Sequence, residues 1–491
     1  MMDVGGQGGE GRGSGRRSLL RLTTALTFLT VAACAGHPAL GDPRAMTFLP
    51  VEFAPPEPER VVFDNGMVIY LLEDHELPLI TITASMRTGS WLDPADKIGL
   101  ASMTGSVMRT GGGGGLSAEQ VDEELEQFAG NVGIGIGRQS GSASLDVLSK
   151  NLKQGLHIFA GLIRAPAFDP ARVELAKLQA IEAIRRRQDH PGSIVSREFV
   201  KMLYGAGHPT ARESSIESVK RITRDDLVAF HRSTIHPNGI ILGVTGDFTR
   251  DEILAALREV FGDWQKGTVP ELMIADVPEH EASKPAIRFI DKDTTQAHLR
   301  AGHLSIKEDD PDYVALAIAN DILGGSSFRS RIFNDVRTKQ GLAYSVGSRL
   351  NTGMHDQGIW LVRAETKLAS TQEVIRRFLT NIERMRTELV SDAELAEAKE
   401  AYVNSFVFSF SSPSAIVSRL IELEYDGLPK DFLQQLREKV VKLTKEDILA
   451  AARKHLHPDR LKIIAVGSGE TLPNVLSTFG EVKEIKPLPE G

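Results

Sequence analysis

The chain repeats one pattern of residues at a constant distance, and this repeat limits the folds that are open to it. Thr223 recurs as Thr444 and Gly246 as Gly467, a shift of 221 residues in both cases. The positions that recur are Thr223, Asp226, Ala229, His236, Pro237 and Gly246, which become Thr444, Asp447, Ala450, His457, Pro458 and Gly467. A gapless match of this kind indicates a duplication. We therefore expect two homologous units, residues 57–265 and 287–491, joined by a polar, proline-containing linker over 266–286.

Each unit has the pattern of paired strands with helices in separate stretches. In the first unit, Asp64-Asn65-Gly66 is a hairpin turn signal between two β-rich runs, and Leu79–Ala84 is a third run. Ser117 and Gln120 form a predicted capping box, and a long helix is expected from Asp169-Pro170 through Arg187. This order favours the α+β class, with two α/β-sandwich units, over a doubly wound sheet.

Composition excludes several classes of protein. The net charge is −8 at 491 residues, with no apolar run near the ~20 residues of a membrane-spanning helix. We therefore expect no nucleic-acid partner and no spanning helix. The glycines at 111–115 are expected to form a loop and not a phosphate cradle, because no G-K-[ST] follows them.

The N-terminus has the pattern of an export signal. Arg16-Arg17 precedes the apolar stretch Leu19–Ala33, which ends at Cys34, the single cysteine of the chain. Val31-Ala32-Ala33-Cys34 resembles a bacterial lipobox, so we expect a signal peptide at 1–34, a tether at 35–56 and lipidation of Cys34. The alternatives are a plain signal peptide and a twin-arginine signal. The expected location is the periplasm or cell envelope, with contact to the membrane only through the lipid anchor.

The segment Gly89–Gly111 resembles the zinc-binding helix of the insulinase/pitrilysin (inverted zincin) metallopeptidases. In that family Gly-Leu-Ala is followed by H-x-x-E-H, two histidine ligands and a glutamate base. Here Gly99-Leu100-Ala101 is followed by Ser102, Gly105 and Ser106 at those three positions. Glu182 maps close to the family's third ligand, and a lone carboxylate does not hold zinc, so we expect no metal on this chain. From its own sequence Glu182 is a solvated or ion-paired helix residue.

The resemblance continues through most of the chain. The segments that carry it are Phe168-Asp169-Pro170, Leu203–Pro209, Leu323–Ser327, Arg331–Arg337 and Gly341–Val346. In the family, four α+β units enclose the substrate as a clamshell, in one long chain or in two shorter ones. The resemblance implies that this chain supplies half of an insulinase-like clamshell.

Arg337 and Tyr344 are the candidate functional pair. Phe328, Ile332 and Val336 have helical spacing, so we expect a helix that packs this face, ends at Gly341 and leads into a strand at Tyr344. The resemblance implies that the Arg and Tyr, seven residues apart, face the zinc from the opposite half and donate hydrogen bonds to the substrate carbonyl or oxyanion. The alternative is structural: Arg337 caps a helix end and Tyr344 is a half-buried strand residue.

These residues lead to two functional hypotheses. The resemblance to mitochondrial processing peptidase and two-chain bacterial relatives implies a non-catalytic subunit of a heterodimeric zinc peptidase, with zinc on the partner subunit and a peptide substrate. The alternative is a non-enzymatic peptide-binding or scaffold protein of the bacterial envelope. His298, His303, His455 and His457 are expected to be packed or surface histidines. Ser102 and Ser106 lack the G-x-S-x-G context of a serine hydrolase.

Overall fold

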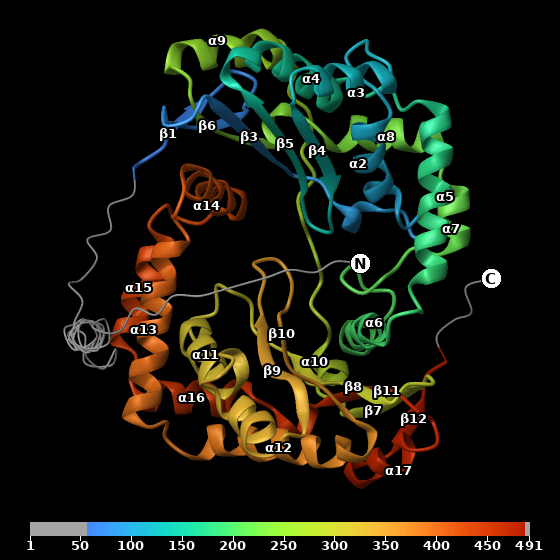
Figure 1. Ribbon diagram of the computed structural model, residues 1–491, viewed down its shortest axis with the longest axis vertical. Coiled ribbons are helices and arrows are strands. Elements are labelled where there is room, and N and C mark those ends of the chain that lie inside the picture. Colours follow the sequence, from blue (N-terminus) through green and yellow to red (C-terminus); the bar gives the residue numbers. More distant parts are fainter. Residues whose placement is uncertain (1–55, 487–491) are drawn as a thin grey trace, which may run out of the picture. The chain divides into compact units, whose positions relative to one another are not determined.

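Two mixed β-sheets form the framework of the computed structural model, which describes residues 56–486 (Figure 1). The strands of the first sheet are β1 (Glu59–Val62), β2 (Val68–Glu73), β3 (Leu79–Met86), β4 (Asn131–Ile136), β5 (Gly141–Leu148) and β6 (Ile240–Gly246). The strands of the second sheet are β7 (Ala286–Asp291), β8 (Gln296–Leu304), β9 (Ala343–Asn351), β10 (Ile359–Lys367), β11 (Lys462–Gly467) and β12 (Val482–Glu484).

Helices surround both sheets. Those of the first sequence unit are α2 (Leu100–Thr110), α3 (Ala118–Gln127), α4 (Leu152–Arg164), α5 (Pro170–Arg186), α6 (Pro191–Tyr204), α7 (Ile216–Arg221), α8 (Arg224–Thr234) and α9 (Arg250–Phe261). The others are α10 (Glu279–Ala282), α11 (Tyr313–Asn320), α12 (Thr371–Thr387), α13 (Asp392–Phe408), α14 (Pro413–Asp426), α15 (Phe432–Lys442), α16 (Lys445–His455) and α17 (Leu472–Leu476). None of the helices in residues 56–486 has the length and apolar character needed to cross a membrane.

The order of the strands confirms the duplication. The sheets run β1-β2-β6-β3-β5-β4 and β12-β7-β11-β8-β10-β9. From the second strand onward the two orders correspond, including the parallel pairs β2/β6 and β7/β11. The recurring Thr and Asp are N-terminal capping boxes, Thr223 with Asp226 on α8 and Thr444 with Asp447 on α16. The repeat in sequence is therefore a repeat of one helix–strand junction.

Local signals place three other features as expected. The Asp64–Gly66 turn joins β1 and β2 as an antiparallel hairpin. Ser117 and Gln120 form the capping box of α3, and Asp169 caps α5, which begins at Pro170. The α+β class predicted from the sequence is confirmed.

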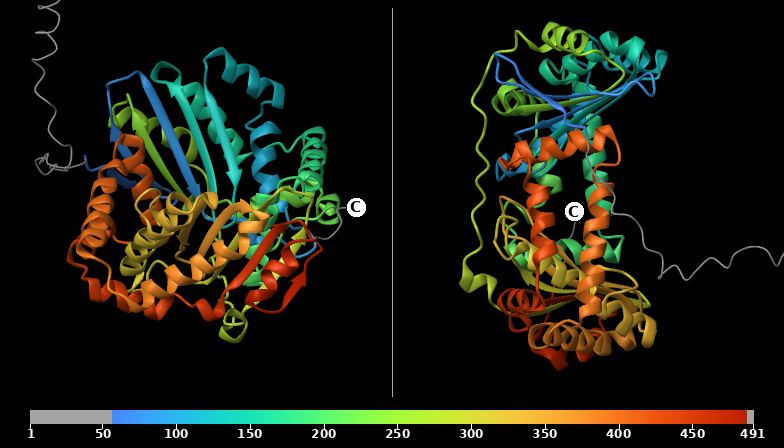
Figure 2. Two further views of the ribbon diagram at one scale, coloured as in Figure 1. Left: turned by 60° about the horizontal axis from the view of Figure 1, so that its bottom comes forward. Right: turned by 90° about the vertical axis from the view of Figure 1, so that its left-hand side faces the viewer.

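Two helices pack on the sheet of the other sequence unit, which the sequence did not predict. Helix α6 packs on the second sheet, where Phe199 lies among buried residues that include Leu361 and Ile464. Helix α14 packs on the first sheet (Figure 2). There Val417 lies with Tyr70 in one buried cluster. A Cβ at Gly243 would lie 2.2 Å from Val417 Cγ1, so the close approach of α14 to β6 requires glycine there. The exchanged helices thus form two further hydrophobic clusters, each on the sheet of the other unit.

A matched pair of tyrosines fixes this exchange. Tyr204, the last residue of α6, donates its hydroxyl hydrogen to the carbonyl of Gln357 in the β9–β10 connection. Tyr425 of α14 donates to the carbonyl of Gln139 in the β4–β5 connection at 2.7 Å. Each unit therefore holds the hairpin of the other by the same contact.

Candidate functional site

Helix α2 carries the degenerate zinc motif, and a buried carboxylate fixes its first turn. Asp93 accepts hydrogen bonds from the backbone N–H groups of Gly99 and Ala101, both at 2.8 Å. Burial raises the pKa of Asp93, while these hydrogen bonds act in the opposite direction. Gly99 has a φ of +107°, a conformation that favours glycine at this turn. The helix is therefore held at its N-terminus without any metal ligand.

The three motif positions divide into two exposed serines and one buried glycine. Ser102 and Ser106 are one turn apart and exposed, whereas Gly105 is buried. Helix α2 packs on β4 (Figure 1). A Cβ at Gly105 would lie 2.5 Å from the backbone nitrogen of Ile136 and 2.9 Å from the carbonyl carbon of Gly135. These contacts leave no space for a side chain. The position where the resemblance expects a glutamate base is therefore closed by the packing of α2 on β4.

Glu182 is an ion-paired residue of α5, as expected from its sequence. Its carboxylate lies 2.7 Å from Nε of Arg186 and 3.9 Å from Nη1 of Arg185, and its side chain is half exposed. Two arginines of its own helix therefore lie beside this carboxylate, where a metal ion would have to displace them. Together with two serine hydroxyls, which are poor zinc ligands, this donor set does not fit a zinc ion.

One other group in the described part of the chain has the residue types of a metal site. Ligand atoms of Asp310, Asp312 and His455 lie within 4.8 Å of one another. Asp312 already accepts hydrogen bonds from Lys454 Nζ at 2.6 Å and from His455 Nε2 at 2.8 Å. The lysine ammonium supplies the positive charge that a cation would bring, so this cluster is an ion-pair network between α11 and α16.

Arg337 lies on an unusual helical segment. Two short π-helical segments, η5 (Asp321–Gly325) and η6 (Phe333–Lys339), flank an irregular turn. Helices of this type are rare in proteins, and those that occur often lie at functional sites. Gly341, with a φ of +61°, ends η6, and its N–H donates to the carbonyl of Arg337 at 3.0 Å. The predicted end of the helix at Gly341 is confirmed.

Tyr344 follows at the start of β9 and is the extra residue of a β-bulge. Glu365 of β10 pairs with Ser345, but the next residue, Thr366, pairs with Ala343, so Tyr344 has no partner. A bulge changes the direction of the side chain that it contains. The side chain of Tyr344 is 79% exposed.

The corner between η6 and β9 brings the guanidinium and the phenol together. Cζ of Arg337 lies 4.6 Å from the centroid of the Tyr344 ring and 4.9 Å from that of the Phe333 ring. Cation–π contact of this kind orients the guanidinium but leaves its N–H donors at the ring edge free for a ligand. The part these two groups play with substrate stays a prediction.

One expectation for this corner was wrong. Phe328 was expected to share the packed face of Ile332 and Val336, but it is 75% exposed, whereas both of those residues are fully buried. The helix begins only at Arg331, so Phe328 lies in the preceding turn. There its ring makes an edge contact with Phe333 at 5.0 Å between centroids. The alternative of a half-buried Tyr344 also differs from the observed exposure.

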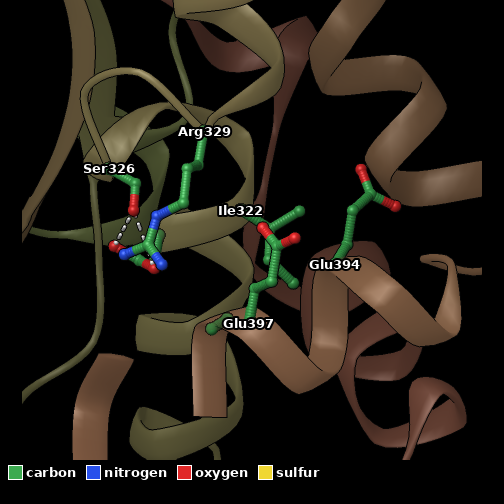
Figure 3. Close-up of a pocket in the computed structure, with 7 residues that line it drawn as sticks. Ile322, Ser326, Arg329, Glu394 and Glu397 are labelled. Atoms are coloured by element: carbon green, nitrogen blue, oxygen red, sulfur yellow. Dashed lines mark hydrogen bonds between the residues drawn. The ribbon is translucent and has the colours of Figure 1, made fainter. Parts of the chain in front are cut away.

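The depression behind η5 is too small for a substrate. Asp321, Ser326 and Arg329 line it from one side, and Glu394 and Glu397 of α13 from the other (Figure 3). Ser326 donates to the Asp321 carboxylate at 3.0 Å. The volume of the depression is about 20 Å³, the space of one water molecule.

Two histidines of β8 have contacts that sequence spacing missed. His303 is buried against Trp360, and its Nε2 accepts a hydrogen bond from the backbone N–H of His457 at 3.1 Å. His298 lies 3.7 Å from Glu365 Oε1, although the sequence places no carboxylate at ligand spacing from it. Both contacts depend on strand register, which adjacent residues do not reveal.

Comparisons with known proteins, by sequence and by structure, find similar proteins whose names refer to peptidases. Residues 221–402 match the family model described as the peptidase M16 inactive domain. A Bacillus subtilis protein named "Uncharacterized zinc protease YmxG" is 24% identical over 365 residues, which cover 74% of this chain and 86% of that protein. The Helicobacter pylori "Non-peptidase homolog YmxG" is 24% identical over 402 residues, which cover 81% and 90%. The crystal structure of a peptidase M16 inactive domain from Pseudomonas fluorescens superposes with a TM-score of 0.75 at 26% identity, over 84% of this chain and 98% of that one.

Proposed function

The chain belongs to the M16 peptidase family and lacks the family's zinc motif, and from this we propose that it is the non-catalytic subunit of a two-chain zinc peptidase. Its partner would be an insulinase-type subunit with an intact H-x-x-E-H motif. Zinc held by that partner would activate the water that attacks the peptide bond. This chain would contribute the groups that bind the substrate carbonyl.

The observation that carries the proposal is the preserved corner of Arg337 and Tyr344. The guanidinium is oriented by two aromatic rings, 4.6 and 4.9 Å from its carbon, while the phenol is almost fully exposed. Neither group is needed to complete a buried core. Donors fixed before the reaction and aimed at developing negative charge lower a barrier by about 2.7–4 kcal/mol each. An arginine and a tyrosine held in this way suit a carbonyl oxygen that becomes an oxyanion.

Closure of the zinc position on this chain also supports a division of labour. Gly105 leaves no space for a base, and Glu182 is paired with arginines of its own helix. Proteolysis would therefore require the partner for metal and water, and this chain for substrate binding. A chain kept only for structure would have no evident need of the exposed Arg337–Tyr344 corner.

The test is peptide cleavage by the co-expressed pair of chains. Arg337→Ala and Tyr344→Phe are each expected to lower kcat about a hundredfold or more, because each removes a donor to the oxyanion. Both variants should still co-purify with the zinc-bearing partner. The matched control is Arg376→Ala on α12, whose side chain is 58% exposed and lies 3.9 Å from its nearest carboxylate, Glu373.

Unchanged cleavage in both variants would refute this role. The result would then favour the non-enzymatic alternative, a peptide-binding or scaffold protein of the envelope. Cys34 lies outside the described residues, so lipidation and location in the cell envelope stay predictions. Metabolic labelling with a fatty acid, compared between the native chain and Cys34→Ala, would test them.

A further inference from the structure

Three arginines lie on one face of the second sheet and form a feature that we call the arginine stripe: Arg300 of β8, Arg349 of β9 and Arg363 of β10. Arg363 pairs directly with Arg300 across the strands. On its other side Arg363 pairs with Gly347, two residues before Arg349. Residues two apart on a strand share a face, so the three side chains project from the same side of the sheet.

None of these arginines has an acidic partner in the described part of the chain. Elsewhere the structure does pair its arginines: Arg331 lies 2.6 Å from Glu394, and Arg377 lies 2.9 Å from Asp335. Like charges directly opposite on neighbouring strands are destabilising. Burial, and then repulsion from Arg363 and Arg349, lowers the pKa of Arg300. The stripe therefore costs stability that no ion pair within residues 56–486 offsets.

A second unsatisfied group lies at the end of the stripe. His298 is two residues before Arg300 on β8 and shares its face. Its Nδ1 is buried and has no hydrogen-bond partner. The nearest carboxylate oxygen, on Glu365, is 3.7 Å away, beyond hydrogen-bond distance. A buried polar atom without a partner is rare in native proteins. Because the His298 nitrogen is closed to solvent, the three arginines are the groups that point to an external acceptor of hydrogen bonds.

We propose that the arginine stripe binds the carboxylate of an acidic residue in a peptide substrate. This inference rests on the proposed function and adds the substrate class to it. Arginine binds carboxylates through two parallel hydrogen bonds, which matches a glutamate or aspartate side chain. The stripe occupies only three adjacent strands, and the whole chain has a net charge of −8. A nucleic-acid site needs a longer basic track along the phosphates.

Distances along β9 give the spacing of the acidic residue. Tyr344 and Arg349 lie five residues apart on one strand, which is about 17 Å at the usual rise per residue. Gly347, opposite Arg363, is three residues from Tyr344, or about 10 Å. An extended peptide whose carbonyl is bound at Tyr344 would therefore place its acidic residue about three to five positions away. Peptides with glutamate at that spacing are the preferred substrates.

The test measures peptide binding to the purified full chain without its partner. Two fluorescent peptides are compared by anisotropy, identical except that one has glutamates where the other has glutamines. The native chain is expected to bind the glutamate peptide about tenfold more tightly, the value of a hydrogen bond to a charged group. Arg349→Gln and Arg363→Gln should each remove most of this preference. Arg363→Gln should also raise the midpoint of thermal unfolding, because it removes the opposed pair with Arg300.

The control variant is Arg376→Gln, which removes the same charge from the exposed surface of α12 and should keep the preference. Equal binding of the two peptides by the native chain would overturn the inference. An equal loss of the glutamate preference in Arg376→Gln would also overturn it. Tighter binding of duplex DNA or of anionic phospholipid vesicles than of the glutamate peptide would overturn it as well. Because no cleavage is measured, a failure of the proposed function, seen as unchanged turnover in Arg337→Ala, is a separate result.

Discussion

Replacement of Gly105 by alanine is predicted to destabilise the chain, although alanine is the better helix former. The added Cβ would lie 2.5 Å from the backbone nitrogen of Ile136 and 3.0 Å from its Cγ1. Helix α2 cannot move away, because Ala101, Val107 and Met108 are fully buried on it. Overpacking costs about 1–3 kcal/mol, and the gain in helix propensity is about 1 kcal/mol. Since the contact is with backbone, we expect a net loss of about 1–2 kcal/mol.

The assay is urea unfolding followed by circular dichroism, with Ser106→Ala as the matched control. Ser106 is the next residue of α2 and is exposed, so alanine there should raise the stability by up to about 0.5 kcal/mol. The two substitutions should therefore shift the unfolding midpoint in opposite directions. A Gly105→Ala chain as stable as the native one would refute the claim that β4 closes this position.

The same contact predicts that the zinc motif cannot be restored by substitution alone. The combination Ser102→His, Gly105→Glu and Ser106→His repeats the family pattern, but the glutamate has the same Cβ as alanine. We expect a poorly folded chain without stoichiometric zinc, measured by elemental analysis. The control keeps Gly105 and changes only the two exposed serines, and it should unfold like the native chain. One zinc per chain in the triple variant, with a native unfolding midpoint, would contradict the reasoning.

Two further predictions concern hydrogen bonds between the sequence units and a buried histidine. Tyr204→Phe and Tyr425→Phe each remove one hydroxyl that joins the sequence units, so each should lower the free energy of unfolding by about 1 kcal/mol, and the losses should add in the double variant. No loss in either urea midpoint would argue against these contacts. Burial lowers the pKa of His303 to about 4 from its ordinary 6.5, so the folded state is favoured above pH 6.5 and loses this contribution as the pH falls toward 4. Thermal midpoints between pH 6.5 and 4 should fall more steeply in the native chain than in His303→Gln, and parallel curves would contradict this.

Local signals predicted several elements because their physical causes lie within a few residues. The Asp64–Gly66 turn and the caps of α3, α5, α8 and α16 satisfy backbone groups next to them in the chain. The prediction for Phe328 was wrong because helical spacing does not show where a helix begins. An irregular turn follows η5, and the helix begins only at Arg331, after Phe328. The pattern of apolar residues alone could not distinguish a π-helical segment from an ordinary helix.

Non-local pairing explains what the sequence analysis missed. An apolar face on α6 or α14 predicts burial, but not that the sheet of the other unit covers it. Strand register brings Arg300 opposite Arg363 and His298 opposite Glu365, and neither pair is close in sequence. The bulge at Tyr344 likewise depends on how β9 pairs with β10. These features had no signal in a single sequence.

The sequence by itself determined that the chain is duplicated, that it is built of α+β units and that serine and glycine replace the zinc ligands. Residue identity and short-range backbone chemistry are enough for those conclusions. Only the tertiary structure decided that the position of Gly105 is closed, that Arg337 meets the ring of Tyr344, and that three arginines share one face of the second sheet. Each of these depends on the distance between atoms of different elements, which is set by the packing of helices and the register of strands.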